Sequence, residues 1–580
     1  MNDFTEYTVS CSGAINKVSE EPHFLNLEHR EGFPNRNVRI KLNDFTSPLF
    51  HLPERLKDLI IIAGYIFAAD RLTYRGTRSD LEYHSWSRFF NFHIKVTDSE
   101  FWNTPAVKDL LSDALSFLTG DHKFQFTFYK DEPHFPSNIF DNEKFIHDKK
   151  KNLFVTLFSG GIDSLSGIIE RLETTDDKLC LVSHQSGQPS VINIQNNLFG
   201  LINSLYPGRC SHYKNNSGLH EISPVDENQR TRAFLFTSTA FAVAKTYNYN
   251  SITIYENGIT SLNLSDTPDL INGRSSRTTH PKTIRLFEKL FTEIGAEPFR
   301  INTPFLFKTK TDVVSIIKEY KRLDTLDISV SCGHSRKSRH GFTHCGGCSQ
   351  CIDRIFATYA ACVERHDDNG IYSFNFLKDP ILKEDDKKVI VNYLKTAQEF
   401  EEHNLDSFFL ERTSELVHIE PYIGGESETD RITKVFDLCK RHSRQVEFAL
   451  ERMREIFDKP LKRKDSNSFF RLILDTRLYQ NKSTTLENSE SPVEKLKTDY
   501  KNEDVKSVSN ELANAQGIIL RQRTKIKTLE KGINRGNLEK LIYDNKSRMK
   551  NGKINYSALG KLLGVTHHTA KAWCKHFSIS

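Results

Sequence analysis

Residues 153–164 constrain the fold more than any other stretch, because an apolar run leads directly into a glycine turn and an acid. Leu153 to Phe158 has the composition of a short buried strand, and the next six residues read Ser-Gly-Gly-Ile-Asp-Ser. Two adjacent glycines let the backbone approach a charged ligand. The helix expected next presents unpaired N–H groups and the positive end of its dipole to an anion. The segment therefore predicts a strand, an anion-binding turn and a helix.

The side chains of this turn suit a nucleotide. Ser159 and Ser164 add hydroxyl donors to the turn at Gly160 and Gly161. Asp163 is an acid beside the expected phosphate site, which makes sense mainly if its carboxylate helps to hold Mg²⁺. The stretch resembles the PP-loop of the ATP pyrophosphatases, which cleave ATP between the α- and β-phosphates. It is not a Walker loop, because no Gly-Lys-Ser/Thr ends it. The alternative is an ordinary glycine-rich turn, which would require neither both serines nor the aspartate.

Length and charge place the chain among multidomain proteins. Its 580 residues are too many for one hydrophobic core, and its net charge of +5 is small, although residues 501–580 are strongly basic. The polar N-terminus shows no secretory signal, and the longest apolar run, Leu59 to Ala69, is too short to cross a bilayer. We therefore expect a cytoplasmic protein without a membrane partner.

Shifts in composition divide the chain into six predicted segments. They are an N-terminal α+β domain at 1–130, a linker at 131–152, an α/β domain at 153–360, a helical domain at 361–480, a polar connector at 481–515 and a basic helical tail at 516–580.

The segment from residue 153 onward alternates short apolar strands with helices, which predicts a parallel sheet covered on both faces. Expected strands lie at 153–158, 179–184 and 251–255, and expected helices near 164–173, 190–204, 230–246, 281–294 and 310–319. Ligands of such sheets bind at the carboxyl ends of the strands, which is where the Ser-Gly-Gly turn lies.

The N-terminal segment mixes both kinds of element. A buried helix is expected around 59–69, a strand at 86–96, a helix at 107–118 and a strand at 124–128. Asp70, Arg71 and Arg75 follow the buried helix, and we expect them to form a surface cap with salt bridges rather than a ligand site.

Four cysteines form the spacing C-x12-C-x2-C-x2-C at Cys332, Cys345, Cys348 and Cys351. Four thiolates within reach of one ion predict a closed, structural zinc site. A redox pair and an iron–sulfur cluster are the alternatives, and the distance of the first cysteine from the other three disfavours the cluster. The nearby His334, His340 and His344 could replace one cysteine, but we expect them beside the site or in solvent.

Together, the PP-loop and the cysteine spacing resemble the QueC (ExsB-like) family of 7-cyano-7-deazaguanine synthases. Further matches follow in the family's order: His184–Gln188, Arg232 with Phe234–Phe236, Pro268–Asp269, Thr303–Pro304, Thr309–Lys310 and Ser331–Cys332. The resemblance covers about residues 153–360, and it implies a HUP-type α/β fold that uses ATP, Mg²⁺ and Zn²⁺.

The resemblance implies a C–N ligase that adenylates a carboxylate, releases pyrophosphate and AMP, and forms an amide and then a nitrile. A carboxylate is a poor electrophile, and adenylation supplies a good leaving group. The implied catalytic residues are Asp163, Lys310 and Arg232. The implied ATP-binding residues are Ser159, Gly160, Gly161, Asp163, Ser164 and His184, and the implied substrate residues are Gln188 and Asp269. For Lys310 and Arg232, a salt bridge on a helix surface is the equally open alternative.

The chain departs from the family in two ways. Its substrate loop, Ser265–Leu270, lacks the family's Cys and nearby Arg, and Ser186 replaces an aromatic residue before Gly187. It also has long extensions on both sides of the core. This architecture resembles QueC-like proteins of bacterial antiphage defence operons, including the Qat type, which implies a 7-deazaguanine or protein acceptor and partners from the same operon. Housekeeping 7-cyano-7-deazaguanine synthesis is the alternative.

The C-terminal tail has a helix-turn-helix pattern within 553–577. Leu559, Leu562 and Leu563 form an apolar face, Gly564 begins a turn, and Thr566 can cap a second helix. Basic residues just before this pattern suit phosphate contacts, so DNA or RNA is the predicted partner. A helical hairpin that packs on the body or binds a protein is the alternative.

Two other functions stay open. A sulfur-transferring PP-loop enzyme that modifies tRNA usually needs a reactive cysteine near the loop, and Cys180 is the only nearby candidate. A non-catalytic, ATP-sensing scaffold that binds nucleic acid would need no chemistry at Asp163.

Overall fold

The computed structural model describes residues 4–15, 23–41, 52–75, 86–131, 153–185, 189–226, 230–264, 277–333 and 342–457 without 368 and 376, together with 468, 469 and 471. Residues 1–410 and 415–475 form one compact unit, to which the following description applies. The predictions for Gln188, Asp269, His334, His340, the connector at 481–515 and the tail at 516–580 lie outside the described residues, as does the linker after residue 131.

The N-terminal part of the chain forms a four-stranded parallel sheet in the order β2-β1-β4-β5. Its elements are β1 (Thr5–Cys11), β2 (Phe24–Leu27), α1 (Glu54–Leu72), β4 (Arg88–Val96), α3 (Ser99–Trp102), α4 (Pro105–Thr119) and β5 (Lys123–Lys130). The buried phenylalanines of β4 and β5 stack across the strands, for example Phe90 on Phe124. The helices and strands predicted in this region are confirmed.

The following part forms a six-stranded sheet in the order β10-β9-β6-β7-β8-β3, in which β3 alone is antiparallel. Its strands are β3 (Val38–Lys41), β6 (Leu153–Leu157), β7 (Lys178–His184), β8 (Cys210–Leu219), β9 (Ser251–Thr253) and β10 (Arg300–Asn302). Its helices are α5 (Ile162–Thr174), α6 (Pro189–Leu205), α7 (Arg232–Thr246), α8 (Gly258–Leu262), α10 (Pro281–Gly295) and α11 (Lys310–Glu319). The predicted parallel α/β sheet is confirmed.

Strand β8 is not predicted from the sequence, because polar side chains fill its buried positions. Asn215 donates to Thr239 Oγ1 at 2.6 Å, and Ser217 donates to Asn215 Oδ1 at 2.6 Å. These hydrogen bonds satisfy groups that would otherwise be costly to bury. The strand therefore lacks the alternation of apolar and polar residues that signals a half-buried strand.

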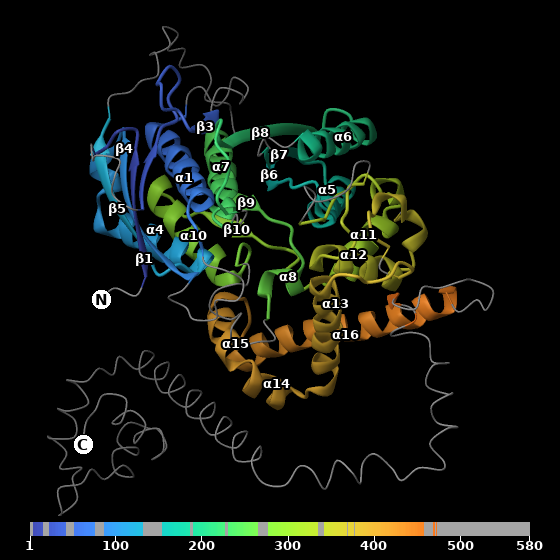
Figure 1. The fold of residues 1–580 in the computed structure, drawn as a ribbon. Coiled ribbons are helices and arrows are strands. Elements are labelled where there is room, and N and C mark those ends of the chain that lie inside the picture. Colours follow the sequence, from blue (N-terminus) through green and yellow to red (C-terminus); the bar gives the residue numbers. More distant parts are fainter. Residues whose placement is uncertain are drawn as a thin grey trace, which may run out of the picture. The chain divides into compact units, whose positions relative to one another are not determined.

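The two sheets share a hydrophobic core. Helix α1 packs on α7, and helix α4 packs on α10. Figure 1 shows these four helices between the two sheets. The same core cluster contains Val9 and Phe92 from the first sheet and Val155 and Val182 from the second. Strand β3, although N-terminal in sequence, pairs with β8 as the edge of the second sheet. The boundaries of the six segments that the composition indicates therefore stay predictions.

The charged residues after the apolar helix are buried, so the expected surface cap is wrong. Asp70, Arg71 and Arg75 are only 1%, 5% and 7% exposed. The reason is that α1 lies between two layers, and its C-terminal end faces other elements instead of solvent. Arg88, on β4, is also buried and bonds Asp70 Oδ1 at 2.6 Å and Asp121 Oδ2 at 2.9 Å.

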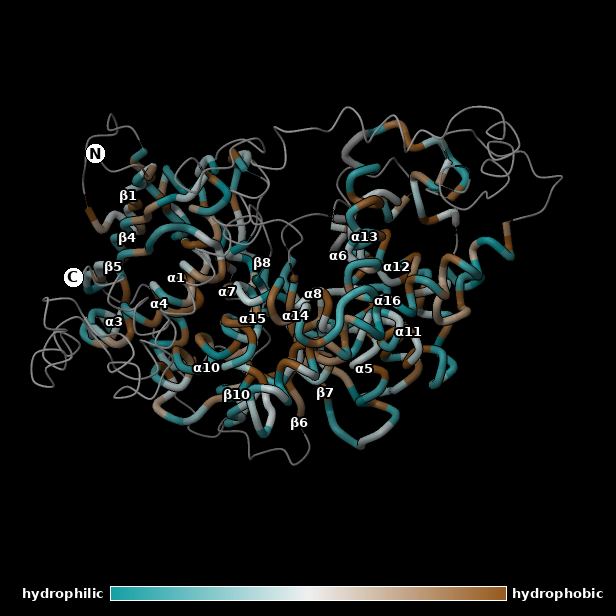
Figure 2. The backbone as a smooth tube through the Cα atoms, turned by 90° about the horizontal axis from the view of Figure 1, so that it is seen from below, coloured by the Kyte–Doolittle hydropathy of each residue, from teal (hydrophilic) through white to brown (hydrophobic). Residues whose placement is uncertain are grey.

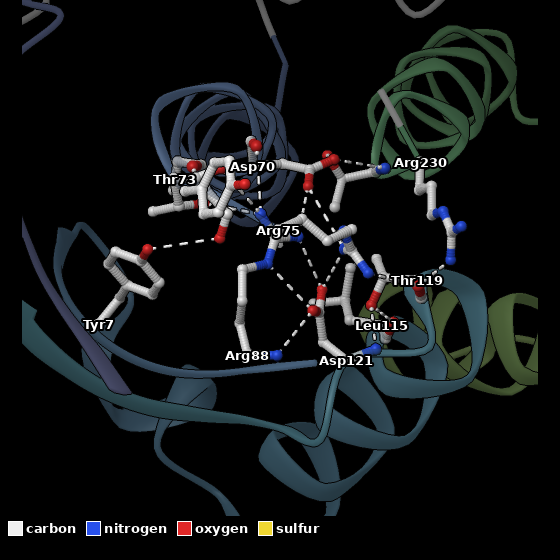
Figure 3. Close-up of polar contacts among 12 residues, drawn as sticks. Tyr7, Asp70, Thr73, Arg75, Arg88, Leu115, Thr119, Asp121 and Arg230 are labelled. Carbon is white, nitrogen blue, oxygen red and sulfur yellow. Dashed lines mark hydrogen bonds and ion pairs between the residues drawn. The ribbon is translucent and has the colours of Figure 1, made fainter. Parts of the chain in front are cut away.

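This buried network connects the N-terminal sheet to α7, as Figure 3 shows. Arg75 bonds Asp121 Oδ2 at 2.6 Å, and Asp70 Oδ2 accepts hydrogen bonds from Thr231 Oγ1 at 2.9 Å and from Thr231 N at 3.2 Å. Arg230 donates to Thr119 O at 2.7 Å. Burial, together with repulsion from Arg75, lowers the pKa of Arg230 to about 9. The network thus joins α1, the loop before β5 and the start of α7.

Replacing Asp121 by Asn should destabilise the fold by about 3–5 kcal/mol, because two buried guanidinium groups would lose their carboxylate. The arginines Arg75 and Arg88 lower the Asp121 pKa to about 2 despite its burial. The contribution of Asp121 to the free energy of unfolding is therefore full above about pH 4, and it is lost as the pH falls through about 2. Urea unfolding at pH 7 measures the effect. Asp109→Asn, at an exposed position of α4, is the control and should change stability by less than about 0.5 kcal/mol.

The described C-terminal region is helical, as predicted. It contains α12 (Ser349–Ala360), α13 (Glu384–Glu402), α14 (Leu405–Glu411), α15 (Thr413–Ile419) and α16 (Glu428–Phe457). Short 3-10 helices occupy Leu323–Thr325, Glu364–His366, Asn369–Ile371 and Glu420–Tyr422. Along α16, hydrophilic and hydrophobic stretches alternate in Figure 2, as expected for a helix with one buried face. No helix among the described residues has the length and apolarity needed to cross a bilayer.

Candidate functional site

The Ser-Gly-Gly turn connects β6 to α5 in the predicted way. Gly160 has a φ of +87°, a left-handed conformation that favours glycine, and Gly161 is the N-cap of α5. Ser159 Oγ accepts from the Gly161 amide at 3.2 Å and lies 3.1 Å from Ser164 Oγ. The turn therefore combines backbone N–H groups, two hydroxyls and a helix N-terminus, which is a suitable arrangement for phosphate.

Asp163 and Lys310, two predicted catalytic residues, form a buried ion pair. Lys310 Nζ lies 2.7 Å from Asp163 Oδ2, and the side chains are only 3% and 9% exposed. Burial alone would raise the pKa of Asp163, but Lys310 and its other partners hold it below the ordinary value. The pKa of Lys310 is raised despite burial, with the Asp163 carboxylate as the main cause. For Lys310, the alternative of a salt bridge on a helix surface is therefore excluded.

Two acidic residues beside this pair were not predicted. Burial and the adjacent Asp163 carboxylate raise the pKa of Glu256 well above its ordinary value. Asp353, on α12, is also buried, and burial raises its pKa while Lys310 opposes the shift. Asn257 donates to Asp163 Oδ2 at 3.3 Å. The sequence could have indicated Glu256 as a site residue, because it directly follows the predicted strand at 251–255. It could not have indicated Asp353, because only the packing of α12 brings this residue close to Lys310.

The carboxylate oxygens of Asp163 and Glu256 fit Mg²⁺, which prefers such ligands, whereas Asn257 presents its amide nitrogen to Asp163 and uses its Oδ1 to cap α8. The Asp163 carboxylate contributes to the raised pKa of Glu256, and a divalent cation bound between them would favour ionisation of both groups.

His184 and Arg232, two further predicted residues, meet on the other side of the turn. Arg232 Nε donates to His184 Nδ1 at 3.2 Å, and His184 Nε2 donates to Ser217 O at 2.8 Å. Burial and Arg232 lower the pKa of His184 to about 3. The imidazole is therefore neutral, and its hydrogen-bond partners fix the tautomer and the position of the Arg232 side chain.

The C-terminal helix α16 supports the N-terminus of α11, where Lys310 is located. Thr309, the N-cap of α11, donates to Gln445 Oε1 at 2.5 Å, and Gln445 donates to Asp312 Oδ1 at 2.9 Å. Arg441 also donates to Asp312 Oδ2 at 3.0 Å. A helix outside the predicted α/β domain therefore positions Lys310.

The four predicted cysteines converge at the start of α12. The Sγ atoms of Cys332, Cys345, Cys348 and Cys351 lie within 4.8 Å of one another, and Cys348 and Cys351 are 3.5 Å apart. A tetrahedral zinc ion with Zn–S bonds near 2.3 Å requires S···S distances of about 3.8 Å, so the cluster fits zinc. Gly346 has a φ of +84°, and a Cβ there would lie 1.9 Å from Phe374 O, so only glycine fits this turn.

His344 is buried beside the cluster, but its ring has other partners. Its Nε2 accepts from Ser331 N at 3.3 Å, and its Nδ1 lies 2.9 Å from Thr343 Oγ1. It thus supports the residue before Cys332, in agreement with the expected place beside the site.

Replacing Gly160 by Ala should weaken ATP binding and destabilise the turn by about 1–2 kcal/mol, because an L-residue is strained at this φ. Space is not limiting, since the nearest atom to the added Cβ would be 3.5 Å away. Titration calorimetry with ATP and Mg²⁺, together with thermal unfolding, measures both effects. Gly200→Ala on α6, where a Cβ meets nothing within 4 Å, is the matched control and should not weaken binding. Equal ATP affinity in both variants would contradict the role of this turn.

Comparison with known families adds to this geometry. Residues 225–361 match the family described as queuosine biosynthesis protein QueC. The match includes Arg232, Lys310 and the four cysteines, and it begins after the Ser159–Ser164 turn. A search of curated proteins gives no match. The family match indicates an ATP-using enzyme of the PP-loop type, related to the synthesis of 7-cyano-7-deazaguanine. Residues 225–361, about a quarter of the chain, are therefore similar to the QueC family.

Proposed function

We propose that the chain is an ATP-dependent ligase that adenylates a carboxylate and then forms a C–N bond. The observation that carries this proposal is the turn at the N-terminus of α5, directly followed by the buried Asp163–Lys310 pair. The pair lies at the carboxyl ends of β6 and β9, where parallel sheets bind their ligands. An anion cradle beside a buried cation suits the polyphosphate of ATP.

The proposed reaction has two steps. A carboxylate oxygen attacks the α-phosphorus of ATP, the bond to the β-phosphate breaks, and pyrophosphate leaves with the bonding electrons. Ammonia or an amine then attacks the acyl carbon, AMP leaves with the C–O electron pair, and the nitrogen loses a proton to give an amide. Dehydration of a primary amide to a nitrile would require a second activation by ATP.

The residues have separate roles in this reaction. The Gly161 amide, Ser159 and Ser164 bind phosphate oxygens, while Lys310 offsets the charge that develops on the leaving pyrophosphate. Asp163 and Glu256 would hold Mg²⁺, which neutralises phosphate charge and aligns the phosphates when bound. Arg232, held by His184, supplies positive charge on the opposite side of the turn.

The proposed acceptor is a 7-deazaguanine carboxylate or a protein, and the proposed setting is antiphage defence with partners from the same operon. The long segments on both sides of the matched residues support this over housekeeping synthesis, because a biosynthetic enzyme needs only the core. The DNA or RNA partner of the basic tail stays a prediction from the sequence.

Sulfur transfer is disfavoured by the positions of the described cysteines near the sheet. Cys180 is buried and pairs in register with Val155, in the middle of β6 and away from the turn. Burial raises the pKa of Cys210 to about 12, so it is a poor nucleophile.

The test incubates the full chain with ATP, Mg²⁺, ammonium and 7-carboxy-7-deazaguanine. We expect equal amounts of AMP and pyrophosphate that depend on the acceptor, with amide or nitrile detected by mass spectrometry. A protein acceptor from the same operon should instead gain mass. ADP and phosphate as products, or no pyrophosphate with any of these acceptors, would contradict the proposal and leave an ATP-sensing scaffold.

A further inference from the structure

The segment that leads to the first cysteine of the cluster, residues 329–331, lies against the Ser-Gly-Gly turn. The amide of Val330 donates to the Gly160 carbonyl at 2.9 Å. A Cβ built on Gly161 would lie 3.6 Å from the Val330 carbonyl oxygen and 3.9 Å from Ser331 Oγ. Although this segment is far from the turn in the sequence, it therefore forms one wall of the turn.

Three hydroxyl groups border Gly161. Ser159 Oγ accepts from the Gly161 amide at 3.2 Å, and Ser164 Oγ donates to the Gly161 carbonyl at 3.1 Å. The third hydroxyl, that of Ser331, is covered by other atoms and has no hydrogen-bond partner among the described residues. A buried hydroxyl without a partner is costly, because it has lost its hydrogen bonds to water. Of these three hydroxyls, the one on Ser331 is therefore still able to pair with a ligand.

Two other buried side chains at the turn also have an oxygen without a partner among the described residues. These atoms are Asp163 Oδ1 and Gln195 Oε1, and the residues are 6% and 0% exposed. Gln195, on α6, lies against the turn, because its Nε2 donates to the Ser159 carbonyl at 3.3 Å and its Cγ would lie 3.5 Å from a Cβ built on Gly160. Buried polar groups in folded proteins are nearly always paired. Unused hydrogen-bonding atoms at three points around one turn therefore indicate a polar ligand there.

The backbone at Ser331 is fixed from both sides. Its amide donates to His344 Nε2 at 3.3 Å, and the next residue, Cys332, belongs to the four-cysteine cluster. On the other side, the fully buried Arg354 of α12 donates to the Ser329 carbonyl at 2.9 Å. Ser331 as a whole is half-buried, so rotation about its Cα–Cβ bond is the one change needed to aim the hydroxyl at a ligand in the turn. This preorganisation lowers the entropy cost of binding.

We propose that Ser331 donates a hydrogen bond to a phosphate oxygen of ATP and is the third hydroxyl of the phosphate site. This inference rests on the proposed function and adds a binding residue from outside the Ser-Gly-Gly stretch. A hydroxyl suits this role, because a hydrogen bond to a charged phosphate is stronger than one between neutral groups. The segment that ends at the first cysteine thus has two functions, since it supplies a thiol to the cluster and a phosphate ligand to the turn.

The test measures binding of α,β-methylene-ATP to the full chain by titration calorimetry in the presence of Mg²⁺. In Ser331→Ala, affinity should fall at least about tenfold, the usual effect of losing one hydrogen bond to a charged group. The unfolding temperature of the ligand-free variant should change by less than about 2 °C, because the hydroxyl has no partner among the described residues. Ser331→Thr keeps the hydroxyl and should keep most of the affinity. Ser349→Ala, at an exposed position beside the same cysteines, is the matched control and should bind like the wild type.

The outcomes separate this inference from the proposed function. Wild-type affinity in Ser331→Ala would overturn the phosphate contact while leaving adenylation intact. A loss of affinity that comes with a drop of more than about 2 °C in the ligand-free unfolding temperature would assign Ser331 to folding instead. An equal loss of affinity for adenosine would place the hydroxyl on the nucleoside and refute the contact with phosphate. A wild-type protein that does not bind the ATP analogue would overturn both proposals together.

Discussion

Asp163→Asn should reduce pyrophosphate release by about 10²–10³-fold, the usual cost of removing one charged group from a site that stabilises developing charge. Asp163 has two roles that Asn cannot fill. It is the anionic partner of buried Lys310, and its charge contributes to the raised pKa of Glu256. Without it, Lys310 has no anion at 2.7 Å, and Mg²⁺ would lose a charged ligand. Single-turnover assays with ATP and the acceptor measure the loss.

A structural effect must be separated from a catalytic one, because an unpaired buried cation costs about 3–5 kcal/mol. The double variant Asp163→Asn/Lys310→Gln removes both charges and should recover most of the stability without recovering activity. Glu170→Gln lies on the same helix, is partly exposed and should leave the rate unchanged within about twofold. Full activity in a folded Asp163→Asn protein would exclude the proposed chemistry and favour a scaffold.

Cys351→Ser should release the zinc ion and destabilise the protein by at least about 4 kcal/mol, because metal binding at such sites is coupled to folding. Cys351 is fully buried, and it packs in the same cluster as Ile352, Phe356 and Tyr372. Loss of the metal would therefore loosen α12, which carries Asp353 toward Lys310. Metal analysis of the purified protein and urea unfolding with and without EDTA measure the two effects.

Cys362→Ser is the matched control, since this thiol is exposed and lies outside the cluster. It should keep one equivalent of zinc and unchanged stability. Visible absorbance from iron in the wild-type protein would instead indicate an iron–sulfur cluster. A wild-type protein that contains no metal and does not respond to EDTA would show that the four thiols have no metal-binding role.

The features predicted correctly from the sequence are those that depend on nearby residues. The turn at Gly160, the parallel strands around it and the cysteine spacing all follow from local composition, because backbone freedom, apolar runs and short ligand spacings are properties of neighbouring residues. Ser159 and Asp163 were proposed from this local pattern and Lys310 from the resemblance to the QueC family, and the structure brings Asp163 and Lys310 together.

Features that depend on packing between distant segments could not be predicted. The polar strand β8 and the position of Asp353 beside Lys310 each depend on a partner far away in the sequence. The same holds for Asp70 and Arg71, which look like a surface cap until β4 and α7 cover them.

The sequence by itself determined that the chain has a strand, an anion-binding turn and a four-thiol cluster, because each is a local pattern with its own chemistry. Only the tertiary structure decided that Arg88 meets Asp70 and Asp121 in a buried network, and that Lys310 pairs with Asp163. The physical reason is that the sequence around a charged residue does not show which residues will surround it in the folded chain. Whether it faces solvent or a shared site is settled by which surfaces the folded chain buries against one another.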